Sequence, residues 1–308
     1  MPANQYQQVT DRIVAMLEAG TRPWVKSWKP GEQPSLGGLV RPVSGISGKP
    51  YTGVNVINLW CAAQERGFSS RYWFTYKGAQ ELGAQVRKGA KSELCFYVGR
   101  QTKTEQPEGE GEATERTFSF LRCYHVFNAA EIEGLPERFY ETDQAPAAVV
   151  DGRIAEADAF VAAAGVPIAH GGDRAFYMPS QDAIRMPHLA QFSSPEAYYS
   201  TLCHELVHAT GIEKRCNRTM GKRFGDSEYA AEELVAELGA CFLCADLAIS
   251  AEPRADSADY LAGWIKILKA DNRAIFTAAA YAEKAAAWLH AQQPSAEELE
   301  APELAMAA

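Results

Sequence analysis

The chain has 308 residues, of which 47% are hydrophobic and 22% are charged, so its composition is that of a globular protein and excludes a wholly disordered or fibrous one. At this length we expect two domains, each with its own hydrophobic core. No apolar segment approaches the roughly 20 residues of a membrane-spanning helix, and the N-terminus lacks the pattern of a secretory signal. Seven cysteines, an odd number, agree with reduced thiols. We therefore expect a cytoplasmic protein with no membrane partner.

The two parts of the chain carry opposite charge. Residues 1–104 contain 14 Lys and Arg against 6 Asp and Glu, a net charge of +8. Residues 105–308 contain 16 against 33, a net charge of −17. Because phosphates are attracted to the first part and repelled by the second, we expect a polyanion to bind the N-terminal part.

The N-terminal part has the pattern of a mixed α and β structure. Hydrophobic spacing predicts an amphipathic helix over residues 4–19, and a loop rich in Gly, Pro, Lys and Arg follows it. Beyond the loop we expect a helix over 54–66, a strand at RYWFT and a short helix at YKGAQELG. Two strands, 92–100 and 116–128, then form a hairpin around a polar, acidic loop.

A passage near residues 135–150 marks the expected domain boundary. It separates a domain over residues 1–140 from one over residues 150–295. The second domain begins with a helix at DGRIAEADAFVAAAG and a hairpin at RAFYMPSQDAIRMP. Helices then follow at about 194–210, 226–249, 257–270 and 273–291. The expected fold class is α+β, with a C-terminal domain that is mostly helical and has a small sheet.

The most specific motif in the chain is His204-Glu205-Leu206-Val207-His208. Histidines at i and i+4 lie on one face of a helix about one turn apart, so both imidazoles can bind one cation. Glu205 lies one step round the helix, where it can hold a metal-bound water and accept its proton. The motif therefore predicts a metal site with Glu205 as a general base.

A catalytic zinc ion usually takes three protein ligands, so a third one is needed. Lys214 stands where a metzincin would carry another histidine, but the following segment AEELVAELGACFL offers Glu232, Glu233 and Glu237. Glu233 and Glu237 share an apolar helix face, where unpaired charges are costly to bury. We expect Glu233 to bind the metal and Glu237 to hydrogen-bond a ligand histidine. Glu232, on a more polar face, is the alternative ligand. Zn²⁺ is the expected ion, with Mn²⁺ or another divalent cation as the alternative.

Aromatic and basic residues alternate through the N-terminal part. Cations that follow a phosphate backbone, together with aromatic rings on which bases stack, are typical of single-strand recognition. We expect contacts to single-stranded DNA, with duplex DNA as a further partner, from Arg22, Trp24, Lys26, Trp28, Lys29, Lys49, Tyr51, Lys77, Arg87, Lys88 and Lys91. The alternative is an ordinary basic surface over buried aromatic side chains.

Several segments together resemble the ArdC-type antirestriction proteins of conjugative plasmids. In the first half these are PWVKSW, GKPYTGVNVINLW, YWFTYKGAQELGAQVRKGAKS and YHVFNAAEIEGLP. In the second half they are YMPSQDAIRMP, YYSTLCHELVHATG and YAAEELVAELGACFL. The resemblance covers nearly the whole chain.

The resemblance implies an N-terminal domain that binds single-stranded DNA and a C-terminal zincin-like, gluzincin-type metallopeptidase domain. It also implies protection of incoming plasmid DNA from host restriction during conjugation. His204, Glu205 and His208 match the family's zincin motif, and Glu233 falls where gluzincin-like enzymes place the third ligand. Two other functions stay open: an intracellular metallopeptidase recruited to DNA-bound host proteins, and a non-enzymatic coat for single strands in which the metal is structural.

Overall fold

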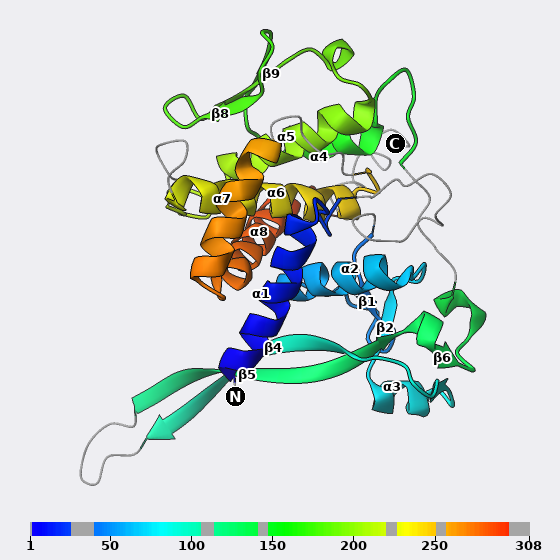
Figure 1. Cartoon of the computed structure of the whole chain (residues 1–308). Coiled ribbons are helices and arrows are strands. Elements are labelled where there is room, and N and C mark those ends of the chain that lie inside the picture. The colour runs from blue at the N-terminus through cyan, green and yellow to red at the C-terminus, as the bar shows by residue number, and fades with distance from the viewer. Residues whose placement is uncertain are drawn as a thin grey trace, which may run out of the picture. The chain divides into compact units, whose positions relative to one another are not determined.

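The computed structural model describes residues 2–25, 40–105, 114–140, 147–219, 227–250 and 257–295 (Figure 1). The chain forms two compact units. Unit 1 comprises Met1–Arg41, Thr52–Ser69 and Thr142–Ala308, and unit 2 comprises Pro42–Tyr51 and Ser70–Glu141. Among the described residues, no helix combines the length and the apolar character needed to cross a membrane, and no cysteine forms a disulfide.

Unit 1 is a helical bundle with a small sheet. Its helices are α1 (Pro2–Glu18), α2 (Val54–Arg66), α4 (Ala155–Ala163), α5 (Pro195–Ala209), α6 (Ser227–Asp246), α7 (Ser257–Ala270) and α8 (Ala274–His290). The sheet has the order β7-β9-β8, from β7 (Ile168–His170), β8 (Phe176–Met178) and β9 (Ala183–Met186). β9 runs parallel to β7 and antiparallel to β8.

Helix α6 is the central element of unit 1, and it packs against α5, α7 and α8 (Figure 1). Its sequence is rich in small and apolar residues on all sides, which is typical of a helix buried all round. At Gly239 the helix passes so close to α5 that a Cβ atom would lie 2.7 Å from Cγ2 of Val207. The lack of a side chain there lets α5 and α6 approach closely enough for their polar groups to meet.

A second contact fixes the β8–β9 hairpin to the end of α5. Asp182 lies in the turn with a positive φ of 47° and accepts a hydrogen bond of 2.8 Å from the hydroxyl of Tyr177. Its carboxylate also pairs with Lys214 at 2.7 Å and with Arg215 at 2.6 Å. Arg215 in turn donates to the carbonyl oxygen of Ala209, the last residue of α5. The hairpin is thus tied to the helix that carries the histidine pair.

This contact makes stability depend on pH. Burial alone would raise the pKa of Asp182, but hydrogen bonds from Arg215, Lys214 and Tyr177 outweigh burial and lower the pKa from 3.8 to about 2. A carboxyl with a lowered pKa stabilises the fold above its unfolded pKa, and this contribution is lost as the pH falls through the folded pKa.

We therefore expect Asp182→Asn to reduce the free energy of unfolding by about 2 kcal/mol at neutral pH, because a shift of one pKa unit corresponds to about 1.4 kcal/mol. The difference in unfolding free energy from wild type should shrink below about pH 4 and be almost lost at about pH 2. Urea unfolding of the metal-free proteins, followed by circular dichroism at several pH values, measures this difference. A difference that stays constant with pH would contradict the role of the Asp182 charge.

Unit 2 is built on a four-stranded sheet of order β1-β2-β5-β4. Its strands are β1 (Val43–Ser44), β2 (Tyr72–Phe74), β4 (Glu93–Glu105) and β5 (Thr114–Asn128), and β1 and β2 are parallel while the other pairs are antiparallel. Helix α3 (Tyr76–Glu81) and a second sheet of β3 (Gln85–Val86) and β6 (Ile132–Glu133) complete the unit. The core contains Phe74, Ile132 and Phe139.

The α+β class predicted from the sequence is confirmed. Helices α2 and α7 have the bounds expected from the sequence, whereas strand β7 was not expected. The two compact units divide the chain differently from the sequence-based domains 1–140 and 150–295, because α1 and α2 belong to unit 1. An apolar stripe shows that a helix has a buried face, but it does not identify the helix that covers it. Helix α1 packs on α7, and α2 packs on α8.

Candidate metal centre

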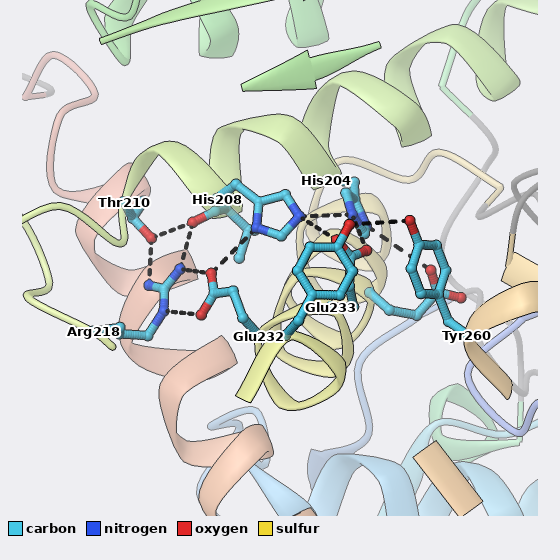
Figure 2. A network of polar contacts seen from close by, with 10 residues as sticks. His204, His208, Thr210, Arg218, Glu232, Glu233 and Tyr260 are labelled. Carbon is cyan, nitrogen blue, oxygen red and sulfur yellow. Dashed lines mark hydrogen bonds and ion pairs between the residues drawn. The ribbon is translucent and has the colours of Figure 1, made fainter. Parts of the chain in front are cut away.

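Helix α5 places the two histidines of the motif one turn apart, facing α6 (Figure 2). The helix begins at Pro195, and the side chain of Ser194 caps it by accepting a 3.0 Å hydrogen bond from the backbone N–H of Ala197. His204 is only 2% exposed. The Nε2 atoms of His204 and His208 lie 3.1 Å apart, so both rings point to the same spot.

Glu233 reaches this spot from α6. One carboxylate oxygen lies 3.4 Å from Nε2 of His204, and the other lies 3.5 Å from Nε2 of His208. One ligand atom from each of the three residues lies within 4.8 Å of the other two. The structure therefore brings together the three ligands that the sequence predicted.

The three groups fit a divalent metal ion. Oε2 of Glu233 is buried, and Nε2 of His204 lies 3.4 Å from it. Two imidazole nitrogens facing each other at 3.1 Å, with a carboxylate beside them, form a set of acceptors that a cation satisfies. Two nitrogens and one oxygen are a typical protein donor set for zinc, and they also suit other borderline first-row cations.

His208 is oriented by Glu232 rather than by Glu237. Its Nδ1 lies 3.2 Å from Oε1 of Glu232. Because an ionised carboxylate only accepts hydrogen bonds, Nδ1 carries a proton, and Nε2 is the atom that would exchange its own proton for a metal ion. Glu232 is as buried as Glu233, although the groups that contact it, His208 and Arg218, are polar.

Arg218 holds Glu232 in this position. Its guanidinium donates to both oxygens of Glu232, at 2.8 and 3.1 Å. It also donates to the carbonyl oxygen of Val207 and to the hydroxyl of Thr210, each at 2.7 Å (Figure 2). Burial alone would raise the pKa of Glu232, but the hydrogen bonds with His208 and Arg218 lower it. Glu232 therefore stays ionised and fixes the ring of His208.

Glu237 has a related position beside the other histidine. Its Oε2 lies 4.0 Å from Nδ1 of His204, beyond hydrogen-bond distance. Its Oε1 lies 3.5 Å from a guanidinium nitrogen of Arg22 and 3.4 Å from Nε1 of Trp24. Glu237 therefore lies next to a ligand histidine but not at the hydrogen-bond distance that the sequence predicted, and residues of the N-terminal segment contact it.

The charges of the site favour anionic glutamates. Burial alone would raise the pKa of Glu233, but hydrogen bonds with His204 and His208 and the charges of these rings hold it well below its usual range. Burial alone would lower the pKa of His208, yet Glu232, Glu233 and the charge of Glu205 raise it to about 10. Glu205 is only 2% exposed, and it lies on α5 between the two histidines in the sequence.

Two tyrosines that the sequence reasoning missed lie beside Glu233. The hydroxyls of Tyr229 and Tyr260 are 3.3 Å apart, and Tyr229 also hydrogen-bonds the side chain of Glu233. Burial, the bond to Tyr260 and the charge of Glu233 raise the pKa of Tyr229, so its hydroxyl keeps its proton. Figure 2 shows Tyr260 on the Glu233 side of the histidine pair. No motif marks a tyrosine on α7 as a neighbour of α5 and α6.

Comparison with known proteins agrees with this geometry. Residues 3–127 match the N-terminal domain of the anti-restriction factor ArdC, and residues 155–281 match a zincin-like metallopeptidase domain. The metal-free crystal structure of the antirestriction protein ArdC from plasmid R388 is 41% identical, with a TM-score of 0.75, over 94% of this chain and 97% of that one. The chain belongs to the ArdC antirestriction family.

Other relatives of this ArdC-family chain extend the comparison. A Mn(II)-bound crystal structure of ArdC from plasmid R388 is 41% identical, with a TM-score of 0.74, over 94% of this chain and 98% of that one. The uncharacterized protein y4eC of Sinorhizobium fredii is 39% identical over 299 residues, which are 96% of this chain and 94% of y4eC. The DNA primase TraC of Escherichia coli is 39% identical over 295 residues, but the match spans only 26% of the primase.

Two of the residues expected to contact DNA are buried in this ArdC-family chain. Trp24 is fully buried and packs edge-on against Trp264 at 6.2 Å between ring centroids. Tyr51 is buried too, and its hydroxyl bonds with Tyr124. The expectation that these two rings stack on bases is therefore wrong, because both fill cores. Arg22 is engaged by Glu237.

The other expected contacts divide into two groups. Lys26, Trp28 and Lys29 lie outside the described residues. The remaining basic residues have exposed side chains, namely Lys49, Lys77, Arg87, Lys88 and Lys91. Their DNA contacts stay predictions.

We expect Glu233→Gln to weaken binding of Zn²⁺ or Mn²⁺ more than Glu232→Gln does. Glu233 supplies a ligand atom, whereas loss of a carboxylate that orients a ligand histidine typically costs 10–100-fold in affinity. Titration calorimetry with each metal, together with metal analysis of the purified proteins, measures both effects. Glu228→Gln is the matched control, because Glu228 is exposed on the same helix. Equal losses for Glu232→Gln and Glu233→Gln would show that the ligand assignment is wrong.

Proposed function

We propose that this ArdC-family protein binds single-stranded DNA in the cytoplasm and protects incoming plasmid DNA from host restriction during conjugation. We further propose that its zincin-like domain is a metal-dependent peptidase that acts on a host protein. The observation that carries the peptidase proposal is the cluster of His204, His208 and Glu233 with the buried carboxylate of Glu205 beside it. The similarity to the antirestriction protein ArdC of plasmid R388, which has a Mn(II)-bound structure, supports both parts.

The proposed metal is Zn²⁺ or Mn²⁺, held by His204, His208 and Glu233. A bound divalent ion in such a site supplies Lewis-acid activation of water and of a peptide carbonyl. Around it, Glu232 keeps the proton on Nδ1 of His208 and thereby orients the ring.

Glu205 is the proposed proton acceptor. It is carried on the same helix as both histidines, and its charge acts on His208. Tyr229 keeps its proton and lies in hydrogen-bond contact with Tyr260, so this pair supplies hydroxyl donors at the edge of the site. A carboxylate for the proton and a hydroxyl for a developing oxyanion are the groups that peptide hydrolysis requires.

A purely structural metal is the competing function. Structural zinc sites are closed by four protein ligands, whereas the described residues bring together three, which leaves a position for water. A structural site also needs no carboxylate between the two ligand histidines in the sequence, which is where Glu205 stands. Both features favour the peptidase.

We expect Glu205→Gln to keep the metal and to lose peptide hydrolysis. The variant retains all three ligands, but an amide cannot accept the proton, and a positioned general base contributes on the order of 10²–10⁴-fold. Hydrolysis of a peptide library and of host-cell extract, followed by mass spectrometry, measures the activity. Metal analysis of the same protein is the control.

Two outcomes would count against the enzymatic part. Hydrolysis by Glu205→Gln at the wild-type rate would remove Glu205 from the mechanism. If metal-loaded wild type cleaves nothing, the domain is not a peptidase. Plasmid transfer into a restricting host, compared for wild type and Glu205→Gln, then shows whether protection needs the site at all.

We expect the full chain to bind single-stranded DNA without sequence preference, and its affinity to fall as salt rises. Each neutralised phosphate releases counterions, with a slope of roughly 0.7 per contact on single strands. Fluorescence anisotropy with a labelled oligothymidine at several salt concentrations measures the slope, and Glu205→Gln should bind like wild type. The full chain is used because a fragment 1–140 would separate α1 and α2 from the helices on which they pack. Binding that does not change with salt would contradict phosphate contact.

A further inference from the structure

The β4–β5 hairpin extends far beyond the sheet from which it starts. Strand β2 pairs only with Phe127 and Asn128 of β5. From the pair Glu93 and Val126 outward, β4 and β5 continue to pair, residue by residue, to Glu105 and Thr114. Within unit 2 the hairpin is therefore a two-stranded ribbon that no further strand flanks among the described residues (Figure 1).

One face of this ribbon changes from buried to exposed along its length. Opposite residues of an antiparallel pair share a face, and the next pair but one lies on that same face. Near the sheet, the pair Cys95 and Tyr124 is covered by Tyr51, which hydrogen-bonds Tyr124. The next pair on this face is Tyr97 and Arg122, and both side chains are exposed, Tyr97 by 56%. Tyr51 therefore covers this face at Cys95 and Tyr124, and the exposed residues Tyr97 and Arg122 follow directly.

Tyr97, Phe120 and Arg122 form a cluster that we call the ribbon platform. Phe120 lies opposite Gly99, and its ring lies across the glycine so closely that a Cβ atom there would be 2.2 Å from the ring. The guanidinium of Arg122 lies 4.9 Å from the centroid of the Phe120 ring. The ring of Tyr97 meets the same ring at 6.5 Å and 63°. Gly99 thus makes room for the ring of Phe120, the guanidinium of Arg122 lies over that ring, and the exposed ring of Tyr97 lies beside them.

We propose that the ribbon platform stacks unpaired bases of single-stranded DNA. The inference rests on the proposed DNA binding and replaces Trp24 and Tyr51 as the aromatic contacts. A ring that is exposed and flanked by a guanidinium offers stacking to a base and charge to the adjacent phosphate. Stacking needs bases that are not enclosed in a duplex, so the same chemistry favours single strands over duplex DNA. The exposed guanidinium of Arg122 is complementary to a polyanion, whereas a protein partner would give no preference for single strands.

Anisotropy of the full chain with labelled oligothymidine tests the ribbon platform. Tyr97→Ala should weaken binding about 5- to 150-fold, because stacking contributes about 1–3 kcal/mol per base, and should leave the salt slope unchanged. Tyr97→Phe, which keeps the ring, should bind like wild type. Arg122→Gln should lower the salt slope by roughly 0.7. Circular dichroism shows whether each variant keeps its fold.

Tyr281→Ala is the matched control, because Tyr281 is a 42% exposed tyrosine on α8, in the other unit. If wild type binds and Tyr97→Ala binds equally well, the ribbon platform is overturned while the proposed DNA binding stands. Loss of binding in Tyr281→Ala alone would overturn it in favour of a surface on unit 1. Equal affinity of wild type for a duplex of the same length would overturn the stacking. If wild type binds no DNA at any salt concentration, the proposed function itself fails.

Discussion

Three carboxylates buried on one helix are the constraint on which unit 1 depends. Glu232, Glu233 and Glu237 lie on α6, the helix that packs against most of the bundle, and each needs a positive partner because burial of an unpaired charge is costly. Glu232 is paired with Arg218 and Glu233 with the two histidines, while Glu237 lies against the N-terminal segment. Satisfying these charges draws three separate stretches of chain around α6. The pairing of buried carboxylates that holds these segments together also assembles the metal centre.

The close approach of α5 and α6 brings the histidines of α5 to the carboxylates of α6. Gly239 has no side chain to hold α5 away, and so the histidines reach the carboxylates of α6 directly. Arg218 donates hydrogen bonds to the carbonyl oxygen of Val207 and the hydroxyl of Thr210 at the end of α5, and it also donates to Glu232. A single guanidinium therefore fixes the distance between the helices and the orientation of His208. Precise ligand geometry here depends on helix packing and not on a rigid loop.

What the sequence could predict was local. His204, Glu205 and His208 lie within five residues, and helix periodicity alone puts the histidines on one side. Glu233 could be predicted because a carboxylate on an apolar helix face signals a partner. The roles of Arg218 and of Glu232 could not be predicted, because they depend on a contact between a loop and a distant helix. The burial of Trp24 was hidden for the same reason: a tryptophan among Pro, Lys and Ser has the composition of an exposed loop, and only the position of α6 decides otherwise.

The anchoring of Trp24 also links the N-terminal segment to the metal centre. Nε1 of Trp24 lies 3.4 Å from one oxygen of Glu237, and the other oxygen of Glu237 lies 4.0 Å from Nδ1 of His204. A single carboxylate therefore separates a core indole from a ligand histidine. Any shift of the His204 ring that accompanies metal binding would be passed through Glu237 to the chain at Trp24, so the occupancy of the metal site and the seating of the N-terminal segment are mechanically coupled.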